Sequence, residues 1–326
     1  MKENIKFIAK LVLVVVLSFA VLYPINLLYK GGQTYGGTFA GMDKFDKVPT
    51  EIEYANFGPS YGMNCFDYES LEAEGKTCFN FALTMQSIYH DYEVYKAYKD
   101  HFSEGAIVAV PLSYFSFTQN LSAVSSARYY KILDKDAIKG YTPENDFSAK
   151  YMPVYGKGSS LIRDLVDGLL DDIMLSTVES DEESPNTTVE ASRETELKND
   201  SNVRVRNVVS GNFEAFDEYI AETEEILVNW LEDMKEAGLR PVLVLTPYWI
   251  DYAKGFETEA LAHAYTEPMQ RVVEKTGIPY IDFNSDEYID YITTPDYFNN
   301  CDHVSPEGGK AFMELFTAYV NEEMLP

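Results

Sequence analysis

The chain has 326 residues, of which 46% are hydrophobic, and a formal net charge of −27. This apolar content excludes a disordered protein, and the acidity excludes a nucleic-acid binder, because a negative surface repels polyanions and no basic patch follows a phosphate backbone. Three cysteines are too few for a disulfide scaffold, and their spacing matches no zinc site.

The N-terminus predicts a membrane anchor. Three lysines precede an uncharged apolar run over residues 11–29, which Lys30 closes. As a helix this run would rise about 28 Å, close to the thickness of a hydrocarbon core. A cleaved signal peptide is the competing interpretation, but no small-x-small site follows and the run is longer than a usual signal core. We therefore expect residues 1–30 to be an uncleaved anchor and residues 31–326 an extracytoplasmic domain.

A strand, a tight turn and a helix are predicted around Ser60. The stretch Glu53–Tyr68 (EYANFGPSYGMNCFDY) has an alternating aromatic lead, a Gly-Pro break and a run that can start a helix. Such a turn lifts a serine off the sheet edge, and the helix N-terminus directs backbone N–H groups at whatever the serine attacks. Ser60 is therefore a candidate nucleophile. The alternative is a plain helix N-cap.

Strands and helices alternate along the rest of the chain. Strands are predicted at residues 51–58, 77–81, 106–112, 241–248 and 278–283, and helices up to 73 and at 84–101, 213–238, 257–276 and beyond 305. Unbroken apolar strands between helices indicate a parallel sheet covered on both faces. The expected fold is α/β, a three-layer flavodoxin-like sandwich with a five-stranded parallel sheet, whose ligands bind at the carboxyl ends of the strands.

A long insertion is expected between the third and fourth strands, over residues 118–212. Its first part holds two helical fragments, Ser125–Leu133 and Leu161–Leu175, and aromatic residues suited to covering the site. Its second part, residues 177–202, has no aromatic residue and is rich in Glu, Ser and Thr, which predicts a flexible acidic loop. The functional alternative is a docking loop for a membrane partner.

The C-terminal stretch supplies a candidate base. His303 is predicted in a loop just before a helix, with Ser305 as its N-cap and Pro306 at its first position. A serine hydroxyl needs a base within hydrogen-bond reach, and a loop histidine after the last strand of an α/β sheet meets that need. We expect His303 to lie at the same sheet edge as Ser60.

These two stretches resemble the SGNH (GDSL-like) hydrolase superfamily. The similarity lies in the nucleophile block, Asn56–Ser60, and in the closing Asp-x-x-His block, Asn300–His303. Within this superfamily, three segments look most like the membrane-anchored DltD-like and AlgJ-like bacterial proteins: NFGPSYGMNCFDY, NFALTMQSIYHDY and VPLSYFSF. Those proteins act on surface polymers and commonly work beside a membrane-bound O-acyltransferase. The resemblance implies that Ser60 attacks an acyl carbonyl, that His303 takes its proton, and that the Ser60 backbone N–H holds the oxyanion.

The sequence departs from this pattern in three places. The aspartate expected three residues before the histidine is Asn300, which predicts a Ser-His dyad oriented by an amide oxygen, unless Asp302 or Asp296 takes that role. The oxyanion glycine of the second block falls at Met85, and the asparagine of the third block has no counterpart in Pro111–Tyr114. The side-chain half of the oxyanion hole therefore does not carry over.

Three other residues are candidates for the site. Gln86 either donates to an oxyanion or satisfies a loop carbonyl, and we favour the second. Ser113 and Tyr114 either line the site or are polar residues at a strand end. His90, His101 and His263 are expected on helix surfaces in solvent. No Gly-rich phosphate loop, dinucleotide fingerprint or metal-ligand cluster occurs, so no cofactor is expected.

The cysteines allow one disulfide hypothesis. Cys65 and Cys301 are predicted at the carboxyl edge of the sheet, and Cys78 at the opposite edge. If the exported chain is oxidised, the bridge joins Cys65 to Cys301, and otherwise all three are small buried hydrophobes.

The functional hypothesis is a serine esterase or O-acyltransferase in the cell membrane, with its catalytic domain outside the cytoplasm. It would act on acyl esters of a cell-surface polysaccharide or teichoic-acid-like polymer. Its partners would be the acylated polymer or acyl donor and a membrane-bound O-acyltransferase. The alternative is a non-catalytic SGNH-like module that binds glycan or assists such an acyltransferase.

Overall fold

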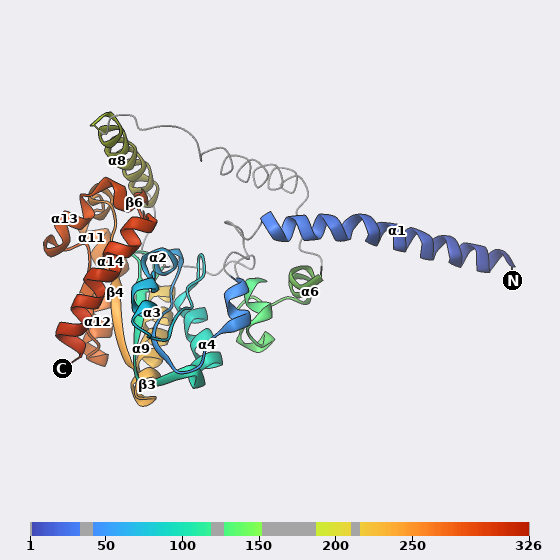
Figure 1. Ribbon diagram of the computed structural model, residues 1–326, viewed down its shortest axis with the longest axis horizontal. Coiled ribbons are helices and arrows are strands. Elements are labelled where there is room, and N and C mark those ends of the chain that lie inside the picture. The colour runs from blue at the N-terminus through green and yellow to red at the C-terminus, as the bar shows by residue number, and fades with distance from the viewer. Residues whose placement is uncertain (1, 33–41, 119–126, 152–186, 210–215, 326) are drawn as a thin grey trace. The chain divides into compact units, whose positions relative to one another are not determined.

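The computed structural model describes residues 2–32, 42–118, 127–151, 187–209 and 216–325 (Figure 1). The chain divides into two compact units. Unit 1 is drawn from Met1–Asp43 and Ser122–Glu183, and unit 2 from Lys44–Leu121 and Ser184–Pro326. Unit 2 contains the sheet and the candidate site residues, and unit 1 contains the N-terminal helix.

Unit 2 is built on a five-stranded parallel sheet in the order β2-β1-β3-β4-β5. Its strands are β1 (Ile52–Asn56), β2 (Cys78–Asn80), β3 (Phe102–Leu112), β4 (Arg240–Leu245) and β5 (Tyr280–Asp282). The run over residues 106–112 of β3 is buried throughout, as a strand covered on both faces requires. The predicted α/β fold with a five-stranded parallel sheet is confirmed.

Helices cover both faces of this sheet. The helix after β1 and the helix after β2 lie on opposite faces, because both crossovers are right-handed and run in opposite directions. On one face α4 (Ile88–Tyr98), α9 (Asp217–Glu236) and α12 (Glu267–Thr276) pack side by side. On the other face α2 (Ser60–Cys65) contacts α14 (Pro306–Tyr319).

Aromatic side chains fill the core on each face of the sheet. Trp230 of α9 is fully buried and meets the ring of Phe57 edge-on, with ring centroids 5.2 Å apart. Phe283, just after β5, packs on Phe312 of α14 at 4.7 Å. Each large ring buries much apolar area, so these contacts fix the helices over the strand ends.

Short elements connect the layers. They are η2 (Met42–Lys47), α3 (Glu69–Ala73), η3 (Lys99–His101), α10 (Ile250–Ala253), α11 (Thr258–Leu261), η7 (Ala262–Thr266), η8 (Asp286–Tyr288), α13 (Ile289–Ile292), η9 (Pro295–Tyr297), β6 (Phe298–Asn300), β7 (His303–Val304) and η10 (Val320–Met324). The antiparallel pair β6 and β7 matters most for function, because β7 begins with the candidate base, His303.

Part of the predicted flexible loop is a helix. Helix α8 (Thr187–Val209) includes residues 187–202, whereas residues 177–186 lie outside the described residues. Composition suggested too little apolar surface for order, but α8 needs only a few contacts. Leu197 and Ser201 are each 1% exposed, and Arg193 and Arg204 of α8 bind residues 298, 299 and 302. The loop prediction is wrong for residues 187–202.

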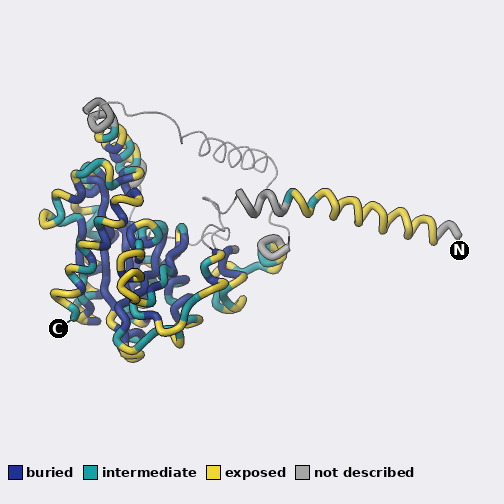
Figure 2. The backbone as a smooth tube through the Cα atoms, viewed as in Figure 1, coloured by how far each residue is buried: buried dark blue, intermediate teal, exposed yellow. Residues whose placement is uncertain are grey.

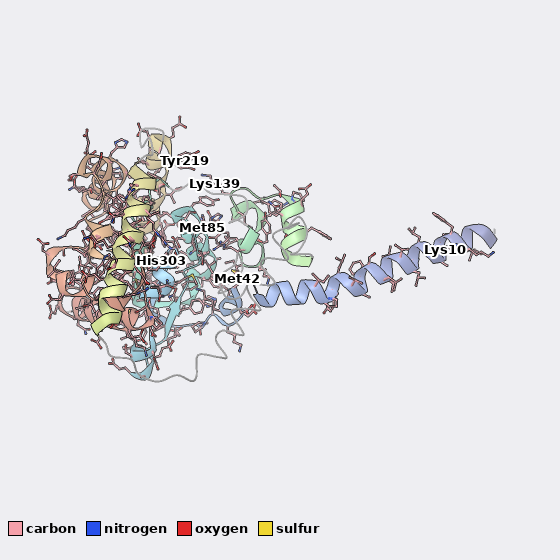
Figure 3. All side chains as sticks on the ribbon, turned by 90° about the horizontal axis from the view of Figure 1, so that it is seen from above. Lys10, Met42, Met85, Lys139, Tyr219 and His303 are labelled. Carbon is pink, nitrogen blue, oxygen red and sulfur yellow. The ribbon has the colours of Figure 1, made fainter. Side chains whose placement is uncertain are left out.

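Unit 1 begins with α1 (Lys2–Gly32). Its segment Ile5–Ile25 has a mean hydropathy of 2.5, and none of that segment is buried, as the exposed tube in Figure 2 shows. Lys10 lies on this helix (Figure 3). Among the described residues this is the one helix long and apolar enough to cross a membrane, a property that signal sequences share.

The rest of the described part of unit 1 is a small helical segment. It consists of η4 (Ala127–Lys131), η5 (Lys135–Ala137) and α6 (Pro143–Tyr151). The rings of Tyr130 and Tyr141 meet edge-on at 5.3 Å. The helix expected at Ser125–Leu133 is thus a short 3₁₀ turn, and the fragment Leu161–Leu175 lies outside the described residues.

Candidate active site

The turn after β1 presents Ser60 at the carboxyl end of the sheet. Gly58 adopts a φ of +99°, which favours glycine, and Pro59 occupies the N-cap position of α2 with extended backbone. Ser60 is the first residue of the helix, so its hydroxyl is not the cap. The N-cap alternative for Ser60 is therefore wrong, and its side chain is available for another role.

Two asparagine side chains hold α2 in place. Asn56 Nδ2 donates to Gly62 O and to Asn80 Oδ1, each at 3.1 Å, and Asn80 Nδ2 donates to Phe66 O at 3.2 Å. Gly62 is required here because a Cβ would lie 2.5 Å from Phe57 O. These bonds satisfy carbonyls at the end of a six-residue helix and so fix the direction in which Ser60 points.

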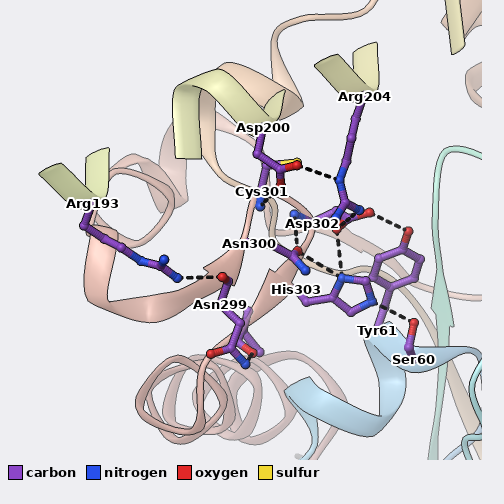
Figure 4. Close-up of polar contacts among 11 residues, drawn as sticks. Ser60, Tyr61, Arg193, Asp200, Arg204, Asn299, Asn300, Cys301, Asp302 and His303 are labelled. Atoms are coloured by element: carbon purple, nitrogen blue, oxygen red, sulfur yellow. Dashed lines mark hydrogen bonds and ion pairs between the residues drawn. The ribbon is translucent and has the colours of Figure 1, made fainter. Parts of the chain in front are cut away.

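His303 reaches Ser60 from the other end of the chain. Ser60 Oγ lies 2.8 Å from His303 Nε2 (Figure 4). Directly after β7, Ser305 caps α14 by accepting from Gly308 N, and Pro306 is the first helical residue, as predicted. The turn between β6 and β7 is held to the segment after β4 by Trp249 N, which donates to Cys301 O at 2.9 Å.

The other ring nitrogen of His303 faces two oxygens. Nδ1 lies 2.8 Å from Asp302 Oδ1 and 3.1 Å from Asn300 Oδ1. The orientation of the Asn300 amide is fixed because the same oxygen accepts from Asp302 N at 3.1 Å. With two acceptors in front of it, Nδ1 must carry the proton, which leaves Nε2 free to accept the proton of Ser60.

The expected dyad is corrected by this geometry. Asn300 does present its amide oxygen to the ring, but the carboxylate of Asp302 lies closer. Asp296 contributes its backbone carbonyl, which accepts from Ser305 Oγ at 2.6 Å. The third position, assigned to Asn300 by spacing, is therefore shared with Asp302, and the site has the three groups of a Ser-His-Asp arrangement.

Asp302 is enclosed by further donors. Its side chain is 7% exposed, its Oδ1 accepts from Arg204 Nη1 at 2.7 Å, and its Oδ2 accepts from Tyr61 OH at 3.2 Å. The Tyr61 ring also stacks on His303, with centroids 4.9 Å apart at 24°. Burial raises the pKa of Tyr61, and the neighbouring Asp302 carboxylate raises it further, so the hydroxyl stays a donor. A carboxylate with its lone pairs occupied is held in one orientation.

The other candidates occupy the surroundings. Gln86 is buried, and its Nε2 donates to Phe81 O at 3.3 Å and to Asp91 Oδ1 at 2.5 Å, in line with the loop-carbonyl interpretation. Ser113 forms a local turn with Ser116. Tyr114 is buried and donates to Ala253 O at 3.3 Å. None of these contacts involves Ser60.

A buried carboxylate supports the nucleophile turn from behind. Asp91 Oδ1 accepts from Gly58 N at 2.7 Å as well as from Gln86 Nε2. Burial raises the pKa of Asp91 to about 7, although both hydrogen bonds oppose that rise. Met85, the residue before Gln86 (labelled in Figure 3), has a φ of +55° and is 55% exposed. The position at which the sequence resemblance implies a glycine thus has a left-handed backbone here.

The three cysteines are free and buried, so the bridge between Cys65 and Cys301 is absent. Burial, followed by a hydrogen bond to Asp200, raises the pKa of Cys301. The Asp200 contact turns Cys301 toward α8, and burial keeps all three thiols protonated.

The remaining histidines differ from expectation in one case. His90 is fully buried, with Nδ1 3.4 Å from Ser87 Oγ, because α4 packs that side against the unit. His101 Nδ1 lies 2.7 Å from Pro49 O, and His263 Nε2 lies 2.7 Å from an Asp217 oxygen on an exposed surface. The solvent prediction is wrong for His90. Among the described residues no group of three His, Cys, Asp or Glu side chains is placed to hold a metal ion.

Two residues of the site were not foreseen from the sequence. Tyr61 follows Ser60 directly, and its aromatic character was visible, but nothing in the local pattern placed its ring on His303. Arg204 lies on α8, just beyond residues 177–202, the stretch that composition marked as a flexible loop. Only the docking of that helix brings its guanidinium to Asp302.

Comparison with known proteins finds solved structures that are similar to this chain only at low TM-scores. No protein-family model matches the chain, and no curated protein matches it. A provisionally assigned acylhydrolase from Bacteroides fragilis has 10% identity and a TM-score of 0.40, over 88% of this chain and 96% of that one. The lipase/acylhydrolase from Enterococcus faecalis has 9% identity and a TM-score of 0.37, over 82% and 95%. The acetyl xylan esterase AlAXEase has 9% identity and a TM-score of 0.36, over 81% and 98%. At these scores the chemistry must be judged from the contacts of Ser60 and His303.

Proposed function

We propose that this protein is a serine esterase or O-acyltransferase. The observation that carries the proposal is the chain of contacts from Ser60 Oγ through His303 to Asp302, with distances of 2.8 Å on each side of the ring. A hydroxyl, a neutral imidazole and a buried carboxylate in this order are the groups that activate a serine for attack on an acyl carbonyl.

The steps follow from these positions. Ser60 Oγ attacks the acyl carbonyl while His303 Nε2 takes its proton, and Asp302 stabilises the resulting imidazolium. The Ser60 backbone N–H at the start of α2 would hold the oxyanion. His303 then returns the proton to the departing alcohol oxygen, which leaves an acyl group on Ser60. Water releases this acyl group as an acid, or a second hydroxyl accepts it as an ester.

We further propose that the enzyme is anchored by α1 and faces the outside of the cell. The apolar segment Ile5–Ile25 and the lysines at its N-terminal end, Lys2, Lys6 and Lys10, support this orientation. Residues 1–30 carry a net charge of +3, so the rest of the chain carries −30. The substrate would be an acyl ester on a surface polysaccharide or teichoic-acid-like polymer, with a membrane-bound O-acyltransferase as partner. The sequence resemblance to membrane-anchored polymer-modifying proteins supports this assignment.

The test is reaction with a serine-directed fluorophosphonate. We expect one adduct per chain on Ser60 by mass spectrometry, and hydrolysis of p-nitrophenyl acetate that Ser60→Ala abolishes. The exchange removes one hydrogen bond, so the free energy of unfolding should fall by only about 1 kcal/mol. A wild-type chain with neither adduct nor hydrolysis would instead favour a non-catalytic binding module, and a Ser60→Ala chain that fails to fold would make Ser60 structural.

A further inference from the structure

Arg204 bridges two carboxylates beside the candidate triad. Its Nη1 donates to Asp302 Oδ1 at 2.7 Å and its Nε to Asp200 Oδ1 at 3.0 Å, while Asp200 Oδ2 accepts from Cys301 N at 3.1 Å (Figure 4). One guanidinium and its partner carboxylate thus contact two successive residues of the turn that leads into His303. The planar fork of arginine suits such a two-sided contact, which a lysine ammonium cannot reproduce.

The contact to Asp302 is direct and concerns the oxygen that the ring uses. Arg204 Nη1 and His303 Nδ1 both bind Asp302 Oδ1, while Tyr61 OH binds the other oxygen. Asp302 is 7% exposed, so its rotation away from this arrangement would leave a buried charge with fewer partners. Removal of Arg204 would therefore release one side of the carboxylate.

Helix α8 carries two other arginines that serve as controls for Arg204. Arg193 on the same helix donates to Phe298 O at 2.7 Å and to Asn299 O at 2.6 Å, both backbone carbonyls of β6. Arg193 thus fastens α8 to the same hairpin without contacting a catalytic side chain. Arg206, two residues beyond Arg204, is exposed. A variant of Arg193 therefore tests the loss of a contact that docks α8, and a variant of Arg206 tests the loss of a surface charge. Neither variant removes a contact to Asp302.

We propose that Arg204 is a positioning residue for the Asp302 carboxylate, and that helix α8 is a working part of the active site. This inference rests on the proposed esterase or acyltransferase function. Arg204 holds Asp302 Oδ1 in front of His303 Nδ1, and its positive charge also offsets part of the carboxylate charge that the ring experiences. It therefore lowers the tendency of His303 to become an imidazolium.

The charge effect has a defined sign. Among the described residues, titratable and charged groups surround the Asp302–His303 pair. They are Ser60 and Tyr61 of α2, Cys301 of the turn, Arg204 and Asp200 of α8, and Tyr248 and Tyr252 after β4. Among them Arg204 is the cation that shares Asp302 Oδ1 with the ring. Its neutralisation should make the imidazolium easier to form, so the ring should gain its proton at a higher pH.

The experiment compares full-length protein in detergent with Arg204→Gln, Arg204→Lys, Arg193→Gln and Arg206→Gln. Arg204→Gln removes the charge but keeps one amide donor, so the turn stays folded. The readouts are kcat/KM for p-nitrophenyl acetate against pH and the NMR titration of the His303 ring, assigned with His303→Gln. We expect Arg204→Gln to lower the plateau of kcat/KM, by up to about 100-fold. Its acidic limb and the ring midpoint should move to higher pH.

The other variants decide the role. Arg204→Lys should restore the wild-type midpoint, because it keeps the charge, but only part of the plateau. Arg193→Gln and Arg206→Gln should leave the midpoint unchanged. A wild-type midpoint in Arg204→Gln, or an equal shift in Arg193→Gln, overturns the inference. If the wild type shows no Ser60-dependent hydrolysis, the proposed function fails, and the NMR midpoint still decides whether Arg204 acts on the Asp302–His303 pair.

Discussion

The carboxylate that faces His303 comes from its immediate sequence neighbour. Adjacent residues of a strand point to opposite sides, which would turn Asp302 away from the ring beside it. In the structure residues 301 and 302 form the turn between β6 and β7, and only His303 belongs to a strand. Alternation therefore does not apply, and the turn brings Asp302 Oδ1 to 2.8 Å from the ring.

Separate substitutions of the two acceptors of His303 Nδ1, Asp302 and Asn300, should distinguish their roles. Asp302→Asn keeps the shape but cannot stabilise an imidazolium, and the same exchange in the well-studied serine protease triad lowers kcat about 10⁴-fold. We expect Asp302→Asn to lower kcat on p-nitrophenyl acetate by roughly 10²-fold or more. Asn300→Ala should cost about 10-fold or less, because one neutral hydrogen bond is lost. A larger loss in Asn300→Ala than in Asp302→Asn would return the third role to Asn300.

Asp91 should give the fold a measurable pH dependence. Burial raises its pKa from 3.8 to about 7, so the folded state holds this proton more tightly than the unfolded chain. Stability from this group is therefore present below pH 4 and is lost as the pH rises toward 7. Asp91→Asn removes the titration. The melting temperature of the variant relative to wild type should rise between pH 4 and pH 8, and a constant difference would show that Asp91 does not titrate in this range.

At the residue scale the sequence was informative where chemistry and turn signals coincided. Gly58 and Pro59 marked the turn before Ser60, and Ser305 with Pro306 marked the helix after His303. Tyr61 and Arg204 carried no such local signal, because their roles depend on where α8 and the β6–β7 turn meet. Long-range contacts of this kind are absent from any spacing pattern.

At the element scale the strands were predicted best. A strand that is buried on both faces is a continuous apolar run in the sequence, and such a run is easily recognised as a strand. Helices were less well bounded. The helix expected from Ser60 to 73 is divided into α2 and α3, and the helix expected at 257–276 contains a π-helical segment, η7, between α11 and α12. Local hydrogen bonds decide these breaks, and apolar periodicity does not record them.

Helix α8 escaped prediction because its apolar contact is small, and that contact is testable. Leu197 is 1% exposed, and Leu197→Ala should lower the free energy of unfolding by about 2–4 kcal/mol in urea titrations. Trypsin should then cut α8 faster at Arg193, Arg204 and Arg206. Val203 on the same helix is 57% exposed, so Val203→Ala should change stability by less than about 0.5 kcal/mol. Equal effects of the two exchanges would mean that Leu197 does not dock α8.

At the scale of the whole molecule the proposed orientation in the membrane can be measured with a single reactive thiol. The three native cysteines are at most 7% exposed, so they give little background. Asp286 has a side chain that is 94% exposed in unit 2. We expect Asp286→Cys to react with an impermeant maleimide on intact cells, whereas Lys6→Cys reacts only after lysis. The reverse pattern would place unit 2 in the cytoplasm.

The fate of α1 needs a separate measurement. If α1 is an anchor, the mass of the membrane-extracted protein should include Met1 or begin at Lys2. A mature chain that begins beyond residue 25 would identify α1 as a cleaved signal sequence instead. The charge of the chain does not distinguish these outcomes, because the part after α1 is strongly acidic in both.

The two partners of the central hydrogen bond are separated by 243 positions in the sequence. Ser60 is synthesised long before His303 and its orienting carboxylate. A growing or truncated chain therefore contains an ordinary serine, without a base to activate it. The same holds for a chain still being threaded unfolded across a membrane. Under the proposed function, reactivity toward esters would begin only where the domain folds, and for a chain exported as proposed that place is outside the cytoplasm.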